Sequence, residues 1–156
     1  MKKIGKDKIQ NLIEQSSNSP RLRSHLNIHD SWEDDIQRLL IALQPGTFIR
    51  PHYHPEPDKK EMIILLQGKC SCINFDKEGN ITESYMLSHE SGNLVCEFPP
   101  SEFHSIFCHD QNTVIMEVKK GPYKPLPTEC FALWSPEENS PQKDLYLQKI
   151  SESIPR

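Results

Sequence analysis

Four side chains suited to binding a metal ion stand close to turns in the middle of the sequence. His52 and His54 are one residue apart in RPHYHPEPDKK, Glu61 follows at the start of EMIILL, and His104 comes much later, after FPPSE. Residues i and i+2 of an extended strand face the same side, so the paired imidazoles can bind one ion. Three histidines and one carboxylate suit Fe(II), Mn(II), Ni(II), Zn(II) or Co(II), with coordination positions left open. We therefore predict a site for one divalent transition metal ion.

Other charged residues are candidates for contacting a small-molecule ligand beside this ion. Arg50 precedes the histidines on their own face and forms either a salt bridge at the rim or a clamp for an anion. His25 belongs to a polar strand face that is either hydrated surface or the wall of a ligand site. Arg38 and its neighbour Gln37 face opposite sides, so at most one reaches a cavity. Lys119 ends the last core strand as a candidate rim residue.

Composition limits the class of protein. The chain has 156 residues, a net charge of -4 and a sequence pI near 6.0, which fits a single domain, residues 1–156. Without a basic stripe, nucleic acid and anionic membranes are not expected partners. The longest apolar run, residues 62–66, is too short to span a bilayer, and no apolar segment follows the N-terminal lysines. We therefore expect a cytoplasmic protein, and its five cysteines read as reduced, mostly buried thiols.

The spacing of apolar segments predicts an all-β fold. Short strands separated by turn residues recur about every eight to twelve residues, as in a sandwich or barrel. The expected elements are a helix over 1–15 with a linker to 20, and a β-barrel over 21–120. The barrel includes strands at 21–30, a pair within 36–54, two within 61–76, one at 81–88, a stretch over 94–109 with a proline break, and one at 113–120. Residues 121–156 are rich in proline and then polar, and we expect a C-terminal arm with a polar tail.

The spacing of the first cluster resembles the first motif of the cupins, G-x5-H-x-H-x(3,4)-E-x6-G. The matching residues are Gly46, His52, His54, Glu61 and Gly68. Six residues separate His54 from Glu61 here, so Glu56 is a rival carboxylate. Glu61 is preferred because it begins a strand and keeps its distance from Gly68.

The second cupin motif, G-x5-P-x-G-x2-H-x3-N, is matched by Gly92, Pro99 and His104. Ser101 replaces its second glycine, which a turn stiffened by proline can tolerate. Cys108 stands where the motif has asparagine, and we interpret it as a packing residue. Together the two motifs imply a double-stranded β-helix, the small jelly-roll barrel of cupins.

A narrower likeness covers residues 21–138. HLNIHDSWEDDIQRLLIALQPGTFIRPHYHP, LQGK, EVKKGPY and FALWSPEE resemble the WbuC-type cupin-fold metalloproteins, which are often encoded among bacterial O-antigen polysaccharide genes. The resemblance implies a metal-binding cupin without an assigned reaction.

Three functions follow as alternatives. One is a metal-dependent enzyme, of isomerase, epimerase or oxygenase type, acting on a small polar, anionic or sugar-derived molecule. The second is a metal-bearing module that binds such a molecule without turnover, and the third is a structural cupin in which the metal only stabilises the barrel. Whether the protein is catalytic stays open. We expect a homodimer, because barrels of this kind commonly pair through sheet edges and faces.

Overall fold

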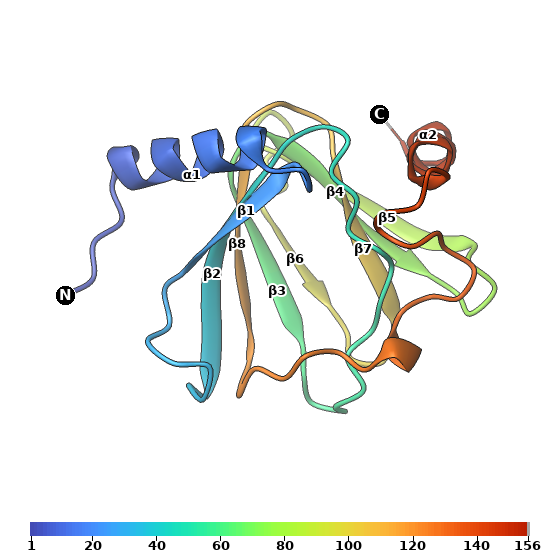
Figure 1. Ribbon diagram of the computed structural model, residues 1–156, viewed down its shortest axis with the longest axis horizontal. Helices are drawn as coiled ribbons and strands as arrows, with labels where there is room; N and C mark the ends of the chain where they lie inside the picture. Colours follow the sequence, from blue (N-terminus) through green and yellow to red (C-terminus); the bar gives the residue numbers. More distant parts are fainter. Residues whose placement is uncertain (156) are drawn as a thin grey trace.

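The computed structural model describes residues 1–155 and contains two α-helices, eight strands and one short 3-10 helix, η1 (Figure 1). The elements in chain order are α1 (Lys6–Asn18), β1 (Arg23–Asn27), β2 (Ile36–Leu43), β3 (Glu61–Gln67), β4 (Lys69–Phe75), β5 (Ile81–Ser88), β6 (Val95–Phe98), β7 (Phe103–Cys108), β8 (Thr113–Lys120), η1 (Thr128–Cys130) and α2 (Lys143–Ser153). Arg156, the end of the predicted tail, lies outside the described residues.

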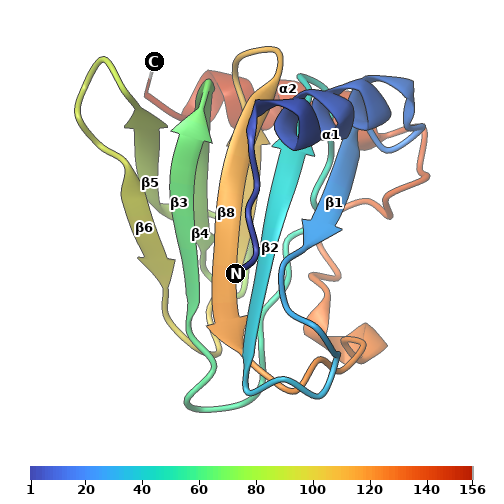
Figure 2. The same ribbon diagram turned by 90° about the vertical axis from the view of Figure 1, so that its left-hand side faces the viewer.

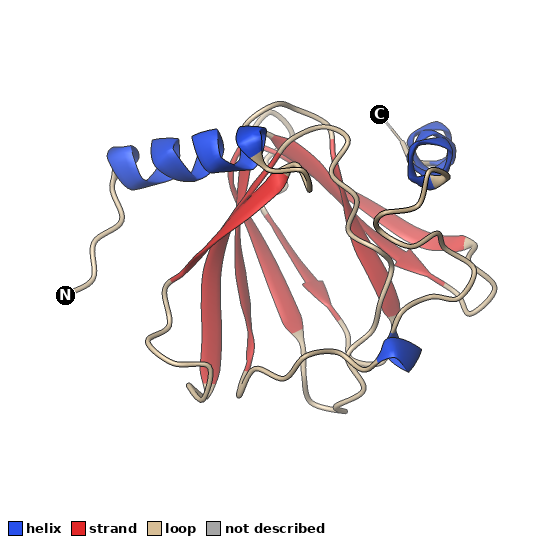
Figure 3. Ribbon diagram, in the orientation of Figure 1, coloured by secondary structure: helices blue, strands red, loops and turns tan. Residues whose placement is uncertain are grey.

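The strands form two antiparallel sheets that face each other (Figure 3). One sheet has the order β1-β2-β8-β3-β6 and the other β5-β4-β7. The sheets lie close together at the end near α1 and further apart at the opposite end, where β3 begins and β8 ends (Figure 1). This is the predicted jelly-roll barrel, with one closed and one open end.

Side-chain alternation places one set of residues from each strand inside the barrel. The inward residues near the closed end are apolar and almost fully buried. They include Ile41, Leu43, Leu65 and Ile115. At the β3–β4 turn of this end, Gly68 has φ +80° and lies so close to Thr113 that a Cβ would meet its backbone at 2.7 Å. The glycine of the motif is therefore required by both conformation and space.

Each helix covers the outer face of one sheet (Figure 2). Leu12 and Ile13 of α1 pack with Leu40, Ala42 and Val114 of the larger sheet. The predicted N-terminal helix is confirmed, with bounds a few residues later than expected.

The C-terminal segment runs from β8 along the open end to the smaller sheet, where α2 lies (Figure 1). Ile150 and Ile154 pack there with Ile73 and Phe75. The polar sequence of the tail did not predict α2. In its sequence, only the apolar residues that pack against the smaller sheet indicate which side of α2 is buried.

Two strand predictions need correction. The strand expected over 21–30 is limited to Arg23–Asn27. The second half of the pair expected within 36–54 is not a regular strand, and His52 forms only isolated bridges there. Pro51, Pro55 and Pro57 lack backbone N–H groups, so a continuous ladder cannot form. Among residues 1–155, no helix has the length and apolar character needed to cross a membrane.

Candidate metal centre

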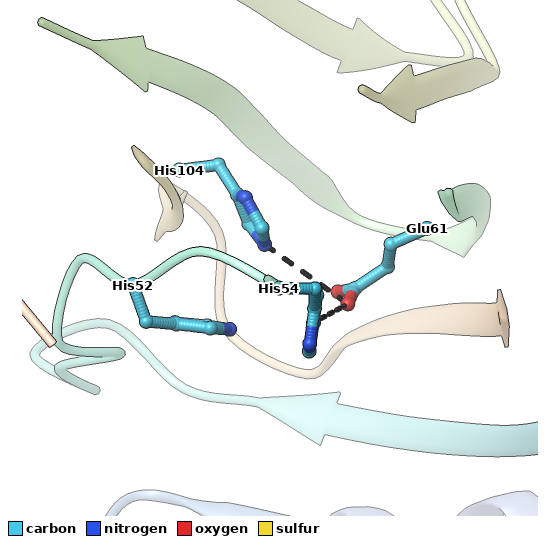
Figure 4. A group of neighbouring side chains, drawn as sticks. All are labelled: His52, His54, Glu61 and His104. Carbon is cyan, nitrogen blue, oxygen red and sulfur yellow. Dashed lines mark hydrogen bonds and ion pairs between the residues drawn. The ribbon is translucent and has the colours of Figure 1, made fainter. Parts of the chain in front are cut away.

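The four residues predicted as metal ligands meet at the open end of the barrel (Figure 4). One potential ligand atom from each of His52, His54, Glu61 and His104 lies within 4.8 Å of the others. Glu61 begins β3 and His104 is the second residue of β7, whereas the first two lie in the connection between β2 and β3. The segment 52–61 and the start of β7, which is remote from it in sequence, therefore contribute to one group.

Backbone bonds hold the His52 segment against β7. The amide of His52 donates to the carbonyl of His104 at 3.2 Å, and the reverse bond is 2.9 Å long. On its other side His52 forms a bridge with Phe131 of the C-terminal segment. These contacts fix the imidazole in an extended segment even though no regular strand is present.

The hydrogen bonds of two rings leave a nitrogen lone pair free. Nδ1 of His52 lies 2.9 Å from the carbonyl oxygen of Arg50, and Nδ1 of His104 lies 2.9 Å from that of Glu102. A carbonyl can only accept, so both Nδ1 atoms carry the proton and both Nε2 atoms have a lone pair. Nε2 of His104 is buried and has no hydrogen-bond partner within residues 1–155. Such a second bond to the backbone is typical of histidines that bind metals.

The third ring interacts directly with the carboxylate. Nε2 of His54 lies 2.8 Å from Oε2 of Glu61, and Nε2 of His104 lies 4.0 Å from the same oxygen (Figure 4). Ser101, which replaces a motif glycine, has φ +62° and donates its amide to the carbonyl of His54 at 3.0 Å. The serine thus adopts the left-handed conformation that a glycine would favour.

Burial and neighbouring charges set the protonation of this group. Burial, followed by repulsion from His104, lowers the pKa of His52 to about 3, and burial also lowers the pKa of His104. Burial would raise the pKa of Glu61, but Lys119 and the bond with His54 hold it well below its ordinary value. Neutral imidazoles and an ionised carboxylate are the protonation states that a divalent ion requires. The donor set and its orphaned nitrogen therefore fit the predicted metal.

The structure decides between Glu56 and Glu61 as the carboxylate of the group, and it shows the surroundings of Cys108. Glu56 lies outside the group, and its Oε1 accepts from Lys59 at 3.3 Å. Cys108 is 3% exposed within the apolar core, and its thiol donates to the carbonyl of Asp110. Glu61 is therefore the carboxylate of the group, and Cys108 is a packing residue.

A cavity of about 600 Å³ opens above the metal group. Three of the four predicted ligand-contact residues, namely Arg50, His25 and Lys119, line it, together with His52, Glu61 and His104. Arg38 does not line it, and that prediction is wrong. The strand alternation turns Arg38 outward, where its Nη2 lies 3.5 Å from Asp34, and turns Gln37 inward.

Lys119 lies between two carboxylates at the metal group. Its Nζ is 2.6 Å from Oε1 of Glu117 and 3.4 Å from Oε2 of Glu61. Burial alone would lower the pKa of Lys119, but the two carboxylates outweigh it and raise that pKa. Burial and repulsion from Glu61 raise the pKa of Glu117 to about 7. Sequence reasoning missed Glu117, although its position two residues before Lys119 puts both on one strand face.

The other two predicted contact residues have different roles. Arg50 donates to the carbonyl of Ala132 at 2.9 Å and to Oγ of Ser135 at 3.3 Å, and its guanidinium lies 5.5 Å from the centre of the Phe131 ring. It therefore holds the C-terminal segment over the open end. His25 is an exposed residue of β1 that lines the cavity. Desolvation by the surrounding cavity wall, with the charges of Arg23 and other cations, lowers the pKa of His25 to about 4.

A second, smaller cavity of about 170 Å³ adjoins the group from another side. It is lined by His52 and His54 together with four lysines, Lys59, Lys119, Lys120 and Lys124. Both cavities therefore reach His52 and Lys119, and cationic side chains surround the smaller one.

The two-sheet jelly roll with this group at its open end defines a protein of the cupin fold. Within that class, the chain belongs to the family described as a domain of unknown function, DUF6016, whose model matches residues 4–87. No curated protein matches the chain in sequence.

Several solved structures share the fold. KdgF from Halomonas sp. is 13% identical with a TM-score of 0.53, and the match covers 68% of this chain and 84% of that one. The SPY1581 protein of unknown function from Streptococcus pyogenes is 14% identical with a TM-score of 0.51, covering 68% and 80%. CapF, solved with the inhibitor 3-isopropenyl-tropolone, is 22% identical with a TM-score of 0.55, covering 69% and 30%. At these identities the likeness concerns the fold alone.

Proposed function

We propose that this protein is a metal-binding cupin of the WbuC type that acts on a small polar, anionic or sugar-derived molecule in surface-polysaccharide metabolism. The observation that supports the proposal most is the convergence of three imidazoles and one carboxylate beside a cavity of about 600 Å³. Cavities of about 300–1,000 Å³ are typical for small ligands.

His52, His54, Glu61 and His104 would hold one divalent ion. When bound, the ion would supply Lewis-acid polarisation of a ligand oxygen. The uncharged side chains deeper in the cavity, including Leu39, Ile41 and Ile106, exclude water from the inner end of a bound ligand.

Glu117 and Lys119 favour an isomerase or epimerase over an oxygenase. Both line the cavity and lie in hydrogen-bond contact with each other at 2.6 Å. Isomerisation and epimerisation move a proton between positions of one molecule, so they need a proton donor and acceptor beside the substrate. A carboxylate and an ammonium group on one strand face provide such a pair.

The test begins with protein purified without a metal-affinity column. Elemental analysis should find about one divalent transition metal ion per chain, and protein with no metal would refute the metal site. The metal-loaded protein is then incubated with a panel of nucleotide sugars and keto acids, and conversion is followed by mass spectrometry and NMR. Turnover supports the enzyme. Ligand-induced thermal stabilisation without product would instead support the non-catalytic binding module. The expected homodimer and the cytoplasmic location stay predictions.

A further inference from the structure

Two arginines and one glutamate form an ion cluster at the mouth of the large cavity. Arg23 begins β1, Arg21 lies two residues before it, and Glu138 lies in the segment between η1 and α2. Nε and Nη2 of Arg21 donate to the two oxygens of Glu138 at 2.7 and 3.2 Å, and Nη2 of Arg23 lies 2.6 Å from Oε1. All three residues line the cavity that contains His52, Glu61 and His104.

Arg23 is held in place independently of Glu138. Its Nη1 donates to the carbonyl of Phe48 at 2.9 Å and to Oγ1 of Thr47 at 3.4 Å, and its side chain is only 7% exposed. The guanidinium would therefore keep its position if the carboxylate moved away. A buried cation that loses its anion is strongly destabilised, so this position requires a negative group at all times.

Glu138 is not held in this way. It belongs to a segment without regular secondary structure, and its side chain is 30% exposed. Within the described residues, the polar contacts of its carboxylate are those with Arg21 and Arg23. A carboxylate or phosphate group of a ligand can accept hydrogen bonds from the two guanidinium groups in the same way as the carboxylate of Glu138.

We propose that Arg21 and Arg23 form the binding site for an oxyanion of the ligand, and that Glu138 occupies this site until the ligand displaces it. The inference rests on the proposed function only in assigning this oxyanion to the ligand of the same cavity. The consequence is that ligand binding frees the segment around Glu138 from the mouth of the barrel.

The first experiment uses metal-free protein, dialysed against a chelator, with inorganic phosphate and acetate as separate probes. Glu138→Gln keeps the shape of the side chain but removes its charge. We expect it to bind at least one probe at least tenfold more tightly than the unaltered protein, by isothermal titration calorimetry. The probe whose binding affinity increases more is the preferred type of oxyanion.

The matched control is Glu137→Gln. Glu137 is the exposed neighbour, so the same charge is removed without freeing the arginines. Its affinities should stay within about twofold of the unaltered protein. Equal affinities in the two variants would overturn the proposal. So would a gain in Glu138→Gln that persists when Arg23→Met is added.

A second measurement needs no variant. Hydrogen exchange of the unaltered metal-free protein is compared in phosphate and in chloride at equal ionic strength. Displacement of Glu138 should raise exchange severalfold in residues 136–142, and unchanged exchange there would overturn the proposal. Both experiments omit the metal, so their outcome does not depend on the metal site. A protein that binds phosphate as expected but never binds metal would support this inference and refute the proposed function. A protein that binds metal but shows neither phosphate effect would refute this inference and leave the proposed function standing.

Discussion

The open and closed ends of the barrel are built from the same strand faces with different side chains. On β3 the inward residues change from Glu61 to Ile63 and Leu65, and on β8 the change runs from Lys119 and Glu117 to Ile115. The strand register pairs these residues layer by layer across the sheet.

The difference separates the parts of the molecule that stabilise it from the part that can bind a ligand. At the closed end, apolar side chains fill the interior. At the open end, a buried nitrogen of His104 has no hydrogen-bond partner among residues 1–155, and the charge of Lys119 compensates two carboxylates. Unsatisfied or compensated buried polar groups cost stability, which is typical of functional sites.

The largest expected effect is at the open end. His104→Ala removes one of the four proposed ligands. A four-ligand zinc site is typically worth about 10–16 kcal/mol, so one ligand should account for about 2.5–4 kcal/mol, roughly 70- to 900-fold in metal affinity. Metal content after purification and competition with a chelator measure the loss.

The control for this variant is His89→Ala, since His89 is exposed and remote from the group. It should retain its metal. If both variants bind metal equally well, the open end is not the metal centre.

At the closed end the effect should fall on stability alone. Leu43 is fully buried in the core, so Leu43→Ala should lower the free energy of unfolding by about 2–5 kcal/mol. Urea denaturation measures this, with Leu133→Ala at an 88% exposed position as the control. Metal per folded chain should not change, and a loss of metal there would show that the two ends are not separable.

Lys119→Met tests the compensation at the open end. The variant leaves Glu61 and Glu117 without their cation, and we expect the metal-free protein to lose about 1–2 kcal/mol of stability. The loss is smaller than for a fully buried pair because Glu117 can take up a proton. A divalent ion should then stabilise the variant more than the unaltered protein, since its charge replaces that of the lysine.

Lys120→Met is the matched control for that experiment, because Lys120 is the next residue and its side chain is 54% exposed. Its stability should change by less than about 0.5 kcal/mol. Equal effects of the two variants would argue against a compensating role for Lys119. Thermal and urea unfolding with and without added metal distinguish these outcomes.

The smallest effect concerns the mouth of the cavity. Burial would raise the pKa of Glu138, but Arg21 and Arg23 lower it below its ordinary value of 4.5. A carboxylate with a lowered pKa stabilises the fold above about pH 4.5, and the contribution is lost as the pH falls through the lowered pKa. The stability difference between the unaltered protein and Glu138→Gln should therefore shrink on acidification. A difference that grows would contradict the ion cluster.

Local patterns predicted most of the strands, and together with the motif resemblance they predicted the group of four. The period of two placed most strands within a few residues, and the motif spacing selected His52, His54, Glu61 and His104, which the structure brings together. The same period places Glu117 and Lys119 on one strand face, so the candidate Lys119 could have pointed to Glu117. The two-residue period wrongly predicted a regular strand near His52. The backbone there is extended, but prolines prevent continuous hydrogen bonding with a partner strand.

The contacts between remote segments could not be predicted in this way. Alternation showed that at most one of Gln37 and Arg38 reaches the cavity but did not show that it is Gln37 rather than the predicted Arg38. No pattern connected Arg21 with Glu138, which lies 117 residues later. Alternation along a strand is a local property of the backbone, so residue order alone specifies it. Which glutamate closes the mouth of the cavity depends on how the chain folds back over the barrel, and only the three-dimensional packing determines that path.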